Sequence, residues 1–174
     1  MLSLLIGDGK GKTTSALGTA LRSAGWEKKV LIIQFIKSNS FQTGERKAIE
    51  RSLTKNIDLK VLGLGFVGIR EDKKSLKEHK LRARKALKET EKAFIIDNYD
   101  LVILDEILGA ITGKLLTTKE VLALINKLEK QADIILTGRK APKSLREKAD
   151  LISEIKKIKH PFDKGILAKQ GLDF

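Results

Sequence analysis

A glycine- and lysine-rich segment at residues 7–14 has the residue types that bind a phosphate chain. It follows a short apolar run at residues 2–6 and precedes a stretch with helical spacing. Such a glycine turn brings several backbone N–H groups together at the positive end of a helix dipole, which suits a polyphosphate. Lys12 adds a point charge, and Thr13 adds a hydroxyl ligand for Mg²⁺. The segment therefore predicts a magnesium-dependent enzyme that uses ATP. Its members are Gly7, Asp8, Gly9, Lys10, Gly11, Lys12, Thr13 and Thr14.

The spacing of this segment departs from the regular P-loop motif, G-x4-G-K-[ST]. That motif would place a glycine at position 6, but Ile6 stands there and the first glycine is Gly7. The loop is therefore one residue short, which suggests that the triphosphate is seated differently. A strand before the segment and a helix after it argue against the alternative, a glycine turn beside surface lysines.

An acidic pair, Asp105-Glu106, ends another fully apolar run at residues 101–104. In P-loop proteins a carboxylate at a strand tip contacts the metal directly or through water. Ligands of parallel α/β sheets gather at the carboxyl ends of the strands. We therefore expect four strand-end residues at one edge of the sheet: Gly7, Gln34, Asp105 and Thr137.

Apolar runs that alternate with helical stretches predict the elements that position these residues. Strands that are apolar throughout indicate a parallel sheet covered on both faces. We expect strands at residues 2–6, 30–36, 59–62, 101–104, 134–137 and 151–158. We expect helices at about residues 13–24, 45–52, 74–96, 119–130 and 141–148. The predicted fold class is α/β, a three-layer P-loop NTPase-type fold with a mostly parallel central sheet, in a single domain of residues 1–174.

The longest predicted helix, at residues 74–96, has one apolar stripe and one charged face. The charged face is expected to meet solvent, and His79 is expected at the surface with it. The stripe consists of Leu76, Ala83, Leu87, Thr90 and Phe94.

The composition excludes several kinds of chemistry. There is no Cys among the 174 residues, so disulfides, thiolate metal sites and cysteine nucleophiles are excluded. No apolar run reaches the roughly 18 residues of a membrane helix, and the N-terminus lacks a basic leader. We expect a soluble, cytoplasmic protein. The net charge of +13 suggests nucleic-acid binding, but the basic residues are spread along the chain and interleaved with Glu.

No residue pattern supplies an obvious nucleophile. The sequence shows no Ser paired with a base and no cluster of metal-ligating His. His160 is open to two interpretations, a functional residue or a packed tail histidine. The predicted role of the protein is therefore to position substrates.

Several segments together resemble the P-loop family of ATP:corrinoid adenosyltransferases, over almost the whole chain. The short glycine loop and the pattern near the C-terminus are the specific parts of the resemblance. The matching segments are residues 7–14, Ala20-Leu21-Arg22 with Gly25, residues 34–37, Gly44-Glu45, residues 104–106, residues 137–139, residues 149–154, residues 159–163, Gly165, Ala168 and Gly171.

The resemblance implies transfer of the 5′-deoxyadenosyl group of ATP to the Co(I) of a reduced corrinoid, with release of triphosphate. Co(I) is then the nucleophile, and the protein contributes proximity and electrostatics. In the family the nucleotide lies in reverse relative to ordinary P-loop enzymes, and the short loop fits that orientation. The preferred corrinoid, cobalamin or a precursor, stays open.

The resemblance also implies roles for particular residues. Residues 7–14 bind the triphosphate, with Lys12 neutralising it, while Thr13, Asp105 and Glu106 hold Mg²⁺. Arg22 reaches the nucleoside end. Three strand-end residues line the same edge, although strand-end packing is an equal alternative for the first: Gln34, Lys37 and Arg139.

A loop with Phe and Trp displaces the lower axial ligand of the corrinoid in this family. The equivalent loop here holds Phe66, but Gly68 stands where many members carry Trp, and the only tryptophan, Trp26, lies elsewhere. Phe66 as a simple exposed loop residue is the alternative. Some members have an N-terminal lid, whereas this chain begins at the first strand, so the lid is dispensable or comes from a second subunit. The resemblance further implies a homodimer and a reductase that supplies electrons.

Two other functions remain as alternatives. One keeps the fold and makes the protein a P-loop kinase or ATPase, in which a hydroxyl or water attacks the terminal phosphate. The other is a basic, ATP-dependent module that binds nucleic acid.

Overall fold

The computed structural model describes residues 1–40, 42–53, 55–65, 67–68 and 72–174. Within these residues, six strands form one sheet in the order β3-β2-β4-β5-β1-β6, and every neighbouring pair is parallel. The strands are β1 Leu2–Ile6, β2 Val30–Ser38, β3 Ile57–Gly63, β4 Leu101–Asp105, β5 Asp133–Thr137 and β6 Leu151–Glu154. Phe66 lies outside the described residues.

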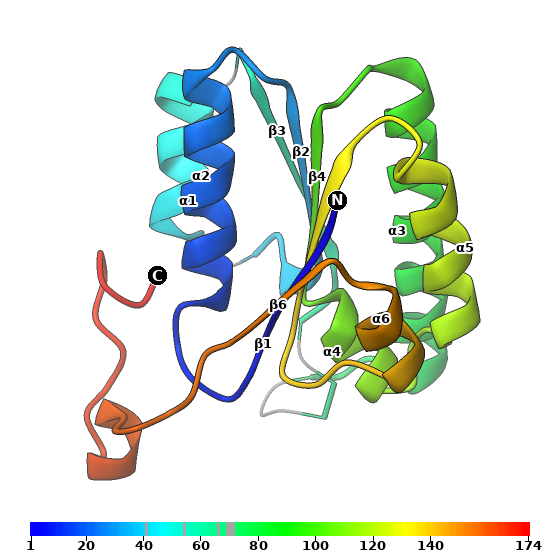
Figure 1. The fold of residues 1–174 in the computed structure, drawn as a ribbon. Helices are drawn as coiled ribbons and strands as arrows, with labels where there is room; N and C mark the ends of the chain where they lie inside the picture. Colours follow the sequence, from blue (N-terminus) through cyan, green and yellow to red (C-terminus); the bar gives the residue numbers. More distant parts are fainter. Residues whose placement is uncertain (41, 54, 66, 69–71) are drawn as a thin grey trace.

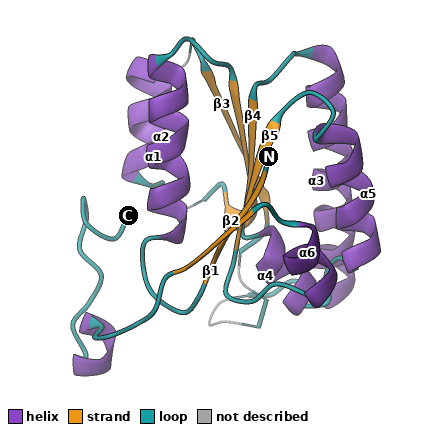
Figure 2. Ribbon diagram, viewed as in Figure 1, coloured by secondary structure: helices purple, strands orange, loops and turns teal. Residues whose placement is uncertain are grey.

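Helices cover both faces of this sheet (Figures 1 and 2). On one face lie α1 and α2, and on the other lie α3, α4, α5 and α6. Their bounds are α1 Lys12–Gly25, α2 Gly44–Ala48 continued by the π-helical turn η1 Ile49–Leu53, α3 Leu76–Ile96, α4 Ile107–Thr112, α5 Thr118–Leu128, α6 Lys143–Lys148 and the 3₁₀ turn η2 Pro161–Lys164. The predicted three-layer α/β fold with a parallel sheet is therefore confirmed.

The apolar strands are buried on both faces, which explains their unbroken hydrophobic runs. Ile32 and Ile103 belong to the core under α1, whereas the adjacent Ile33 and Leu104 belong to the core under α3 and α5. Because neighbouring side chains on a strand point to opposite faces, both must be apolar. None of the described helices is long and apolar enough to cross a membrane.

Several predicted element boundaries differ from the structure. The short helix α4 was not predicted, and β6 ends at Glu154 instead of residue 158. The long helix α3 begins at Leu76 because Ser75 caps it. The Ser75 hydroxyl accepts the Glu78 N–H at 3.2 Å, and the Glu78 carboxylate accepts the Ser75 N–H at 2.7 Å.

The prediction that His79 lies at the surface is wrong. Its side chain is buried, and its Nε2 lies 3.0 Å from a carboxylate oxygen of Asp72. One turn and two turns further along α3, Ala83 and Ala86 are buried on the same side. The opposite correction applies to Leu76, which is exposed and is not part of the buried stripe. A polar residue occupies the buried face because a neighbouring carboxylate satisfies it.

Candidate active site

The glycine loop between β1 and α1 is held between two other segments by backbone hydrogen bonds. The N–H of Gly7 donates to the carbonyl of Arg139 at 3.0 Å, and that of Gly9 donates to the carbonyl of Ile155 at 2.8 Å. Gly7 has a φ of +114°, and a Cβ there would lie 2.2 Å from the Ile155 oxygen. A residue with a side chain therefore does not fit at position 7. The loop is thus fixed by the chain after β5 on one side and by the chain after β6 on the other.

The positive, N-terminal end of α1 lies at this loop, and its capping residue supplies no side-chain hydrogen bond. Gly11 occupies the N-cap with a φ of +117° and no side-chain cap, and the first turn holds no acidic residue. The first N–H groups of a helix have no partner within the helix, and they favour an anion. A bound phosphate would therefore accept hydrogen bonds from the free N–H groups at this end of the helix.

The two lysines of the loop have different partners. Lys12 is partly buried, and its Nζ donates to the Gly9 carbonyl of the same loop at 2.7 Å. Lys10 Nζ donates to the Leu172 carbonyl at 2.9 Å and pairs with the carboxylate of Asp173. A phosphate oxygen can replace a neutral carbonyl as the partner of Lys12, because a charged acceptor forms the stronger hydrogen bond.

Asp105 is the centre of a hydrogen-bond network at the carboxyl edge of the sheet. Its Oδ1 accepts the hydroxyl of Thr13 at 2.8 Å and that of Thr137 at 2.7 Å. Its Oδ2 accepts the Nε2 of Gln34 at 3.2 Å. Asp105 is only 1% exposed. Three strands and the first turn of α1 thus meet at this carboxylate, as the convergence of strand ends predicted.

Glu106 brings a second carboxyl group to the same place. Burial raises the pKa of Glu106 above its ordinary value, and the charge of Asp105 raises it further, while Lys12, Arg139 and Lys37 lower it. Two carboxyl groups that crowd each other in a buried place are stabilised by a bound cation.

The structure makes room for the Glu106 side chain. Glu106 has a φ of +59°, and its N–H donates to the Thr137 hydroxyl at 2.8 Å. A Cβ on Gly109, one turn into α4, would lie only 2.6 Å from Glu106 Oε2. Gly109 was not among the predicted site residues, because its role follows from the unpredicted helix α4.

The donor set at this edge fits Mg²⁺. Mg²⁺ prefers oxygen ligands and is usually held by one or two carboxylates together with water and phosphate oxygens. Thr13, Asp105 and Glu106 supply such oxygens, and the buried Oε1 of Gln34 has no hydrogen-bond partner among the described residues. The same part of the chain has no group of three or more His, Cys, Asp or Glu that could hold a metal alone. A nucleotide bound at the glycine loop would add phosphate oxygens to this donor set.

An ion pair extends the site toward α2. Lys37 Nζ lies 3.2 Å from Glu45 Oε1 and 3.9 Å from Asp105 Oδ2. Burial acts to raise the pKa of Glu45, but its own backbone N–H and Lys37 outweigh burial, and the pKa is lowered. Lys37 was predicted at this edge. Glu45 was not among the predicted site residues, because only its place in the resembling segment Gly44-Glu45 marked it.

The remaining predicted site residues lie in different places. Asp8 accepts the Lys157 N–H at 3.0 Å, so it helps to anchor the loop. Thr14 lines a pocket beside the loop. Arg139 has an exposed side chain near Glu106, and its carbonyl holds Gly7.

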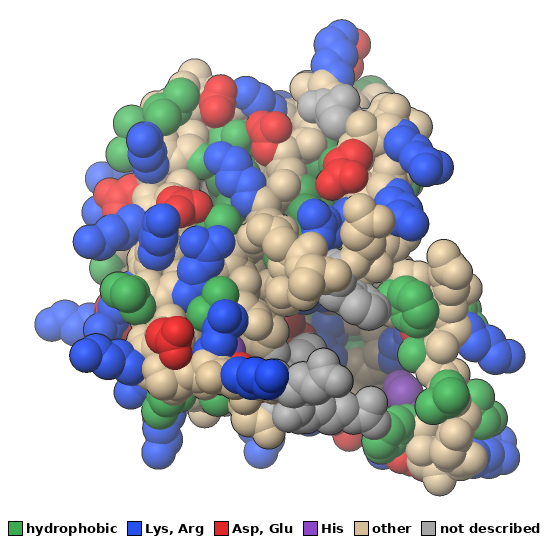
Figure 3. Space-filling view, turned by 180° about the vertical axis from the view of Figure 1, so that it is seen from behind, with side chains coloured by type: hydrophobic (Ala, Val, Ile, Leu, Met, Phe, Trp, Pro, Cys, Tyr) green, Lys and Arg blue, Asp and Glu red, His purple; other side chains and the backbone are tan. Residues whose placement is uncertain are grey.

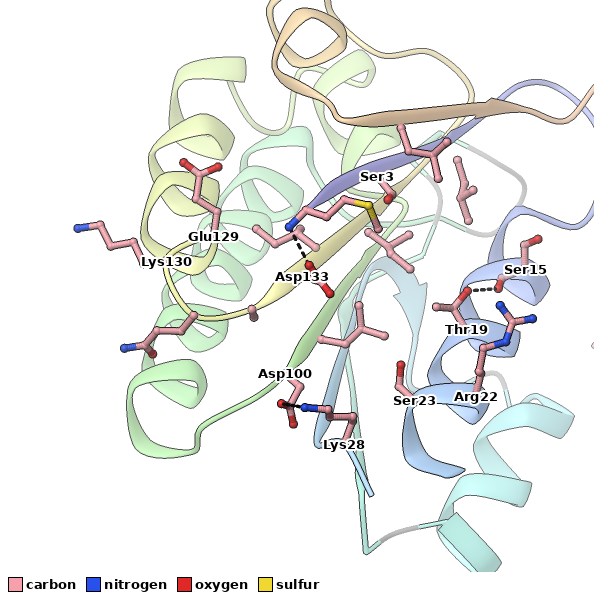
Figure 4. A pocket seen from close by; sticks show the side chains of 18 residues that line it. Ser3, Ser15, Thr19, Arg22, Ser23, Lys28, Asp100, Glu129, Lys130 and Asp133 are labelled. Carbon is pink, nitrogen blue, oxygen red and sulfur yellow. Dashed lines mark hydrogen bonds and ion pairs between the residues drawn. The ribbon is translucent and has the colours of Figure 1, made fainter. Parts of the chain in front are cut away.

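Arg22 does not join this group. It lies ten residues along α1 from Lys12, about 15 Å by helix rise. There it lines a pocket at the amino edge of the sheet, together with Lys28, Asp100 and Asp133 (Figure 4). The contact of Arg22 with a nucleoside remains a prediction.

Comparison with solved structures defines the class of protein. The flagellar accessory protein FlaH of Methanocaldococcus jannaschii superposes with a TM-score of 0.59 at 14% identity, covering 88% of this chain and 70% of FlaH. A KaiC-like protein of Pyrococcus horikoshii superposes with a TM-score of 0.50 at 16% identity, covering 88% and 71%. Together with the glycine loop and the acidic strand end, these similarities establish a P-loop NTPase-type fold.

Sequence comparison is more specific. The family model for the ATP:corrinoid adenosyltransferases BtuR/CobO/CobP matches residues 1–174. The corrinoid adenosyltransferase of Escherichia coli K12 is 32% identical over 174 residues, covering 100% of this chain and 85% of that protein. CobA of Salmonella typhimurium LT2 is 32% identical over 175 residues with the same coverage, and the Sinorhizobium enzyme is 35% identical over 170 residues, covering 97% and 77%. This chain belongs to the ATP:corrinoid adenosyltransferase family.

Proposed function

We propose that residues 1–174 act as one domain, and that the carboxyl edge of its sheet is where the 5′-deoxyadenosyl group of ATP passes to the Co(I) of a reduced corrinoid. The electron pair of Co(I) forms the Co–C5′ bond, the C5′–O bond to the α-phosphate breaks, and its electrons leave with triphosphate. The observation that carries this proposal is the short glycine loop, anchored to Arg139 and Ile155, at an uncapped helix N-terminus.

The loop holds the leaving triphosphate. Backbone N–H groups at the start of α1 and the ammonium of Lys12 are already in place, so they stabilise the charge that develops there without a large rearrangement. Lys12 needs only to exchange the Gly9 carbonyl for a phosphate oxygen. The family supports the reaction, whereas the assignment of these residues to triphosphate rests on their geometry.

Thr13 and Glu106, with Asp105 beside them, would hold Mg²⁺. The ion supplies positive charge that neutralises the triphosphate as it leaves. Thr13 would offer its hydroxyl oxygen to the ion, and Asp105 accepts hydrogen bonds from Thr137 and Gln34 that keep these side chains in position. The raised pKa of Glu106 supports this assignment, because a nearby cation would favour its charged form.

The corrinoid end of the site rests on the family resemblance. The N–H of Gly65, the residue before Phe66 in the sequence, donates to the Ile36 carbonyl at 2.8 Å. Phe66 acts by displacing the lower axial ligand, so that the cobalt is reduced more easily. Three further parts rest on the same resemblance: a reductase that supplies electrons, a homodimer, and a cytoplasmic location.

Product analysis tests the proposal. The protein is incubated with ATP, Mg²⁺ and chemically reduced cobalamin, and the visible spectrum is followed for formation of a cobalt–carbon bond. Formation of that bond with one triphosphate per cobalamin is expected, and excess EDTA should stop it. Release of ADP or inorganic phosphate without a cobalt–carbon bond would instead favour the kinase or ATPase alternative.

A further inference from the structure

Helix α3 buries one histidine beneath a surface that is otherwise charged. Lys and Arg, with Asp and Glu between them, lie on the outer surface of the side formed by α3 and α5, at the left of Figure 3. His79 is only 3% exposed and belongs to the buried face of α3, with Ala83 and Ala86. A buried imidazole needs a hydrogen-bond partner. Its partner is Asp72, in the segment between β3 and α3.

The carboxylate of Asp72 accepts hydrogen bonds from both the loop and the helix, and its side chain is only 8% exposed. Its Oδ2 accepts the N–H of Gly68 at 2.9 Å, and its Oδ1 accepts the N–H of Lys74 at 3.1 Å. His79 Nε2 lies 3.1 Å from Oδ1 and 3.0 Å from Oδ2. The two backbone N–H groups, that of Gly68 first, lower the pKa of Asp72, and His79 lowers it further. Because an ionised carboxylate only accepts, we assign a proton to the Nε2 of His79.

The two ends of this contact differ in how firmly they are held. At the helix end, Arg82 lies three residues after His79, and its Nε donates to the carbonyl of Leu62 in β3 at 2.7 Å. This bond and the core packing of α3 fix His79 relative to the sheet. At the loop end, Gly68 is exposed, and a Cβ there would meet no atom within 4 Å. Packing therefore contributes little to the position of Gly68, and the hydrogen bond to Asp72 contributes more.

The hydrogen bond at Gly68 lies close in sequence to the residue proposed to act on the corrinoid. Gly68 is two residues after Phe66, and Gly65 is one residue before it. The Gly65 N–H donates to the Ile36 carbonyl of β2, so the backbone is held by the sheet before Phe66 and by Asp72 after it. A backbone that is already held loses less conformational entropy when its side chain contacts a ligand.

We infer that Asp72 and His79 are positioning residues for the corrinoid end of the site. His79 holds the carboxylate of Asp72, and that carboxylate holds the backbone at Gly68. The inference deepens the proposed function and rests on it, since it takes Phe66 to displace the lower axial ligand of the corrinoid. Asp72 and His79 act through Phe66, and the cobalt and C5′ are left to other groups.

A purely structural role, as a cap for the start of α3, is the alternative. That start already has a complete capping box, in which Ser75 and Glu78 satisfy each other's backbone N–H groups. The bond from Gly68 to Asp72 adds nothing to this cap, because Gly68 lies outside the helix. The contact therefore serves the loop, and the helix is its support.

The ratio of two transfer rates tests the inference in the full chain with Mg-ATP. One rate starts from Co(II) cobalamin with a chemical reductant, and the other starts from prepared Co(I) cobalamin. Asp72→Ala removes the acceptor of the Gly68 N–H and should lower the Co(II) rate about tenfold, the effect of one hydrogen bond to a charged group. It should lower the Co(I) rate by less than about twofold, because the lower ligand is then already absent.

His79 gives a second pair of variants that keep the buried face of α3 filled. His79→Leu leaves the Asp72 carboxylate without its helix donor and should lower the Co(II) rate about threefold, the effect of one weaker hydrogen bond. His79→Gln keeps an N–H donor of similar reach and should restore the ratio of the unmodified protein. Because leucine suits a buried helix face, His79→Leu tests the inference even if Asp72→Ala does not fold.

Ser75→Ala is the matched control, three residues from Asp72. It removes the cap of α3 but keeps the hydrogen bond from Gly68 to Asp72. It should lower the thermal unfolding midpoint, as loss of a helix cap does. The ratio of the Co(II) and Co(I) rates should stay that of the unmodified protein.

A double variant asks whether Asp72 acts through Phe66. Adding Asp72→Ala to Phe66→Ala should lower the Co(II) rate little beyond Phe66→Ala alone, because the residue being positioned is gone. Losses that multiply would place the action of Asp72 elsewhere.

Electron paramagnetic resonance of bound Co(II) cobalamin gives a readout without turnover. A nitrogen lower ligand splits the Co(II) signal, and the splitting disappears when that ligand is displaced. With Mg-ATP present, the unmodified protein and His79→Gln should lose the splitting. Asp72→Ala should retain it.

Three results would overturn the inference. One is an Asp72→Ala protein with the unmodified ratio of rates and no nitrogen splitting. Another is an equal fall of the ratio in Ser75→Ala, which would mean that the pair only stabilises α3. The third is multiplying losses in the double variant with Phe66→Ala. Failure of the unmodified protein to form a cobalt–carbon bond from Co(I) would contradict the proposed function instead, and the resonance measurement would still decide the inference.

Discussion

Strand β4 is preceded by one aspartate, Asp100, and ends at another, Asp105, and the two differ in burial and in their hydrogen-bond donors. Asp100 precedes the strand at the amino edge of the sheet, where it accepts the Lys29 N–H at 2.9 Å and the Lys28 ammonium at 3.0 Å. The pKa of Asp100 is lowered mainly by the hydrogen bond from the Lys29 N–H and, to a smaller extent, by the hydrogen bond from the Lys28 ammonium. Asp105 ends the strand at the carboxyl edge, is almost fully buried, and accepts only side-chain donors.

The difference extends to the surroundings of each aspartate. At the amino edge, charges are paired at the surface, as with Lys28 and Asp100 or the amine of Met1 and Asp133 at 2.7 Å (Figure 4). Such exposed pairs each contribute little to stability. At the carboxyl edge, Glu106 lies buried beside Asp105 with a raised pKa. The charges at the amino edge are therefore already paired. At the carboxyl edge, added positive charge would stabilise the ionised form of the buried carboxyl groups.

The largest expected contrast is between a lysine at each edge. Lys12→Ala removes a preorganised cation from the proposed triphosphate site and should lower the rate of adenosyl transfer by about 10²–10³-fold, the effect of losing one such donor. Lys28→Ala removes a cation from the amino edge and should leave the rate within about twofold. Both rates are measured from the cobalt–carbon spectrum, with circular dichroism to verify folding. Wild-type turnover of Lys12→Ala would refute the site assignment.

The two aspartates of β4 give the next contrast. In Asp105→Asn the new amide can still accept the Thr13 and Thr137 hydroxyls, and Gln34 can turn its unpartnered Oε1 toward the new donor. The fold should therefore persist, but the negative charge beside the proposed Mg²⁺ site is lost. We expect the Mg²⁺ concentration for half-maximal rate to rise about 10-fold or more, the loss of roughly one charged contact.

Asp100→Asn is the matched control, since it makes the same chemical change five residues away. Its Mg²⁺ dependence should be that of the unmodified protein. Equal shifts in the two variants would mean that the magnesium effect is not local to the carboxyl edge.

Most of the fold was predictable because long apolar runs allow few alternatives. Strands buried on both faces must be apolar throughout, and the glycine loop and Asp105 lie at strand ends that a parallel sheet brings together. The helix α4 was missed because its six residues are too short to show a helical period. Strand β6 ends early because the Ile155 carbonyl, next along the chain, accepts the N–H of Gly9.

The parts of the site that escaped prediction depend on contacts between distant residues. The pair of Lys10 and Asp173 joins residues 163 positions apart, and no local pattern marks it. Lys37 was predicted from its strand end, but its partner Glu45 lies on a separate helix. His79 was misplaced because a charged stretch hides the single acidic partner, Asp72, that allows it to be buried.

A smaller effect is expected from the loop after β3, which also follows a carboxyl strand end. Phe66→Ala should slow transfer from Co(II) cobalamin with a reductant by about tenfold, the scale of one aromatic contact. Transfer from chemically prepared Co(I) should change by less than about twofold, because the lower ligand is already absent. Equal losses from both starting states would argue against ligand displacement by Phe66.

The smallest expected effect concerns stability, and it has opposite signs at the two edges. Because the pKa of Glu106 is raised on folding, its contribution is present below the unfolded value of 4.5 and is lost as the pH rises through the folded pKa. Glu106→Gln should therefore raise the thermal unfolding midpoint at pH 7 in EDTA without nucleotide.

For Asp100 the sign reverses. Its pKa is lowered on folding from 3.8, so its contribution is present above that value and is lost as the pH falls through the folded pKa. Asp100→Asn should lower the unfolding midpoint at pH 7, and its difference from the unmodified protein should persist at pH 4.5, where the gain from Glu106→Gln has begun to vanish. Mg-ATP should remove the gain of Glu106→Gln at pH 7 and leave the loss of Asp100→Asn unchanged, because the proposed cation site lies at the carboxyl edge. Midpoints of the two variants that respond alike to Mg-ATP would show that the edges do not differ in the way their hydrogen bonds and buried charges indicate.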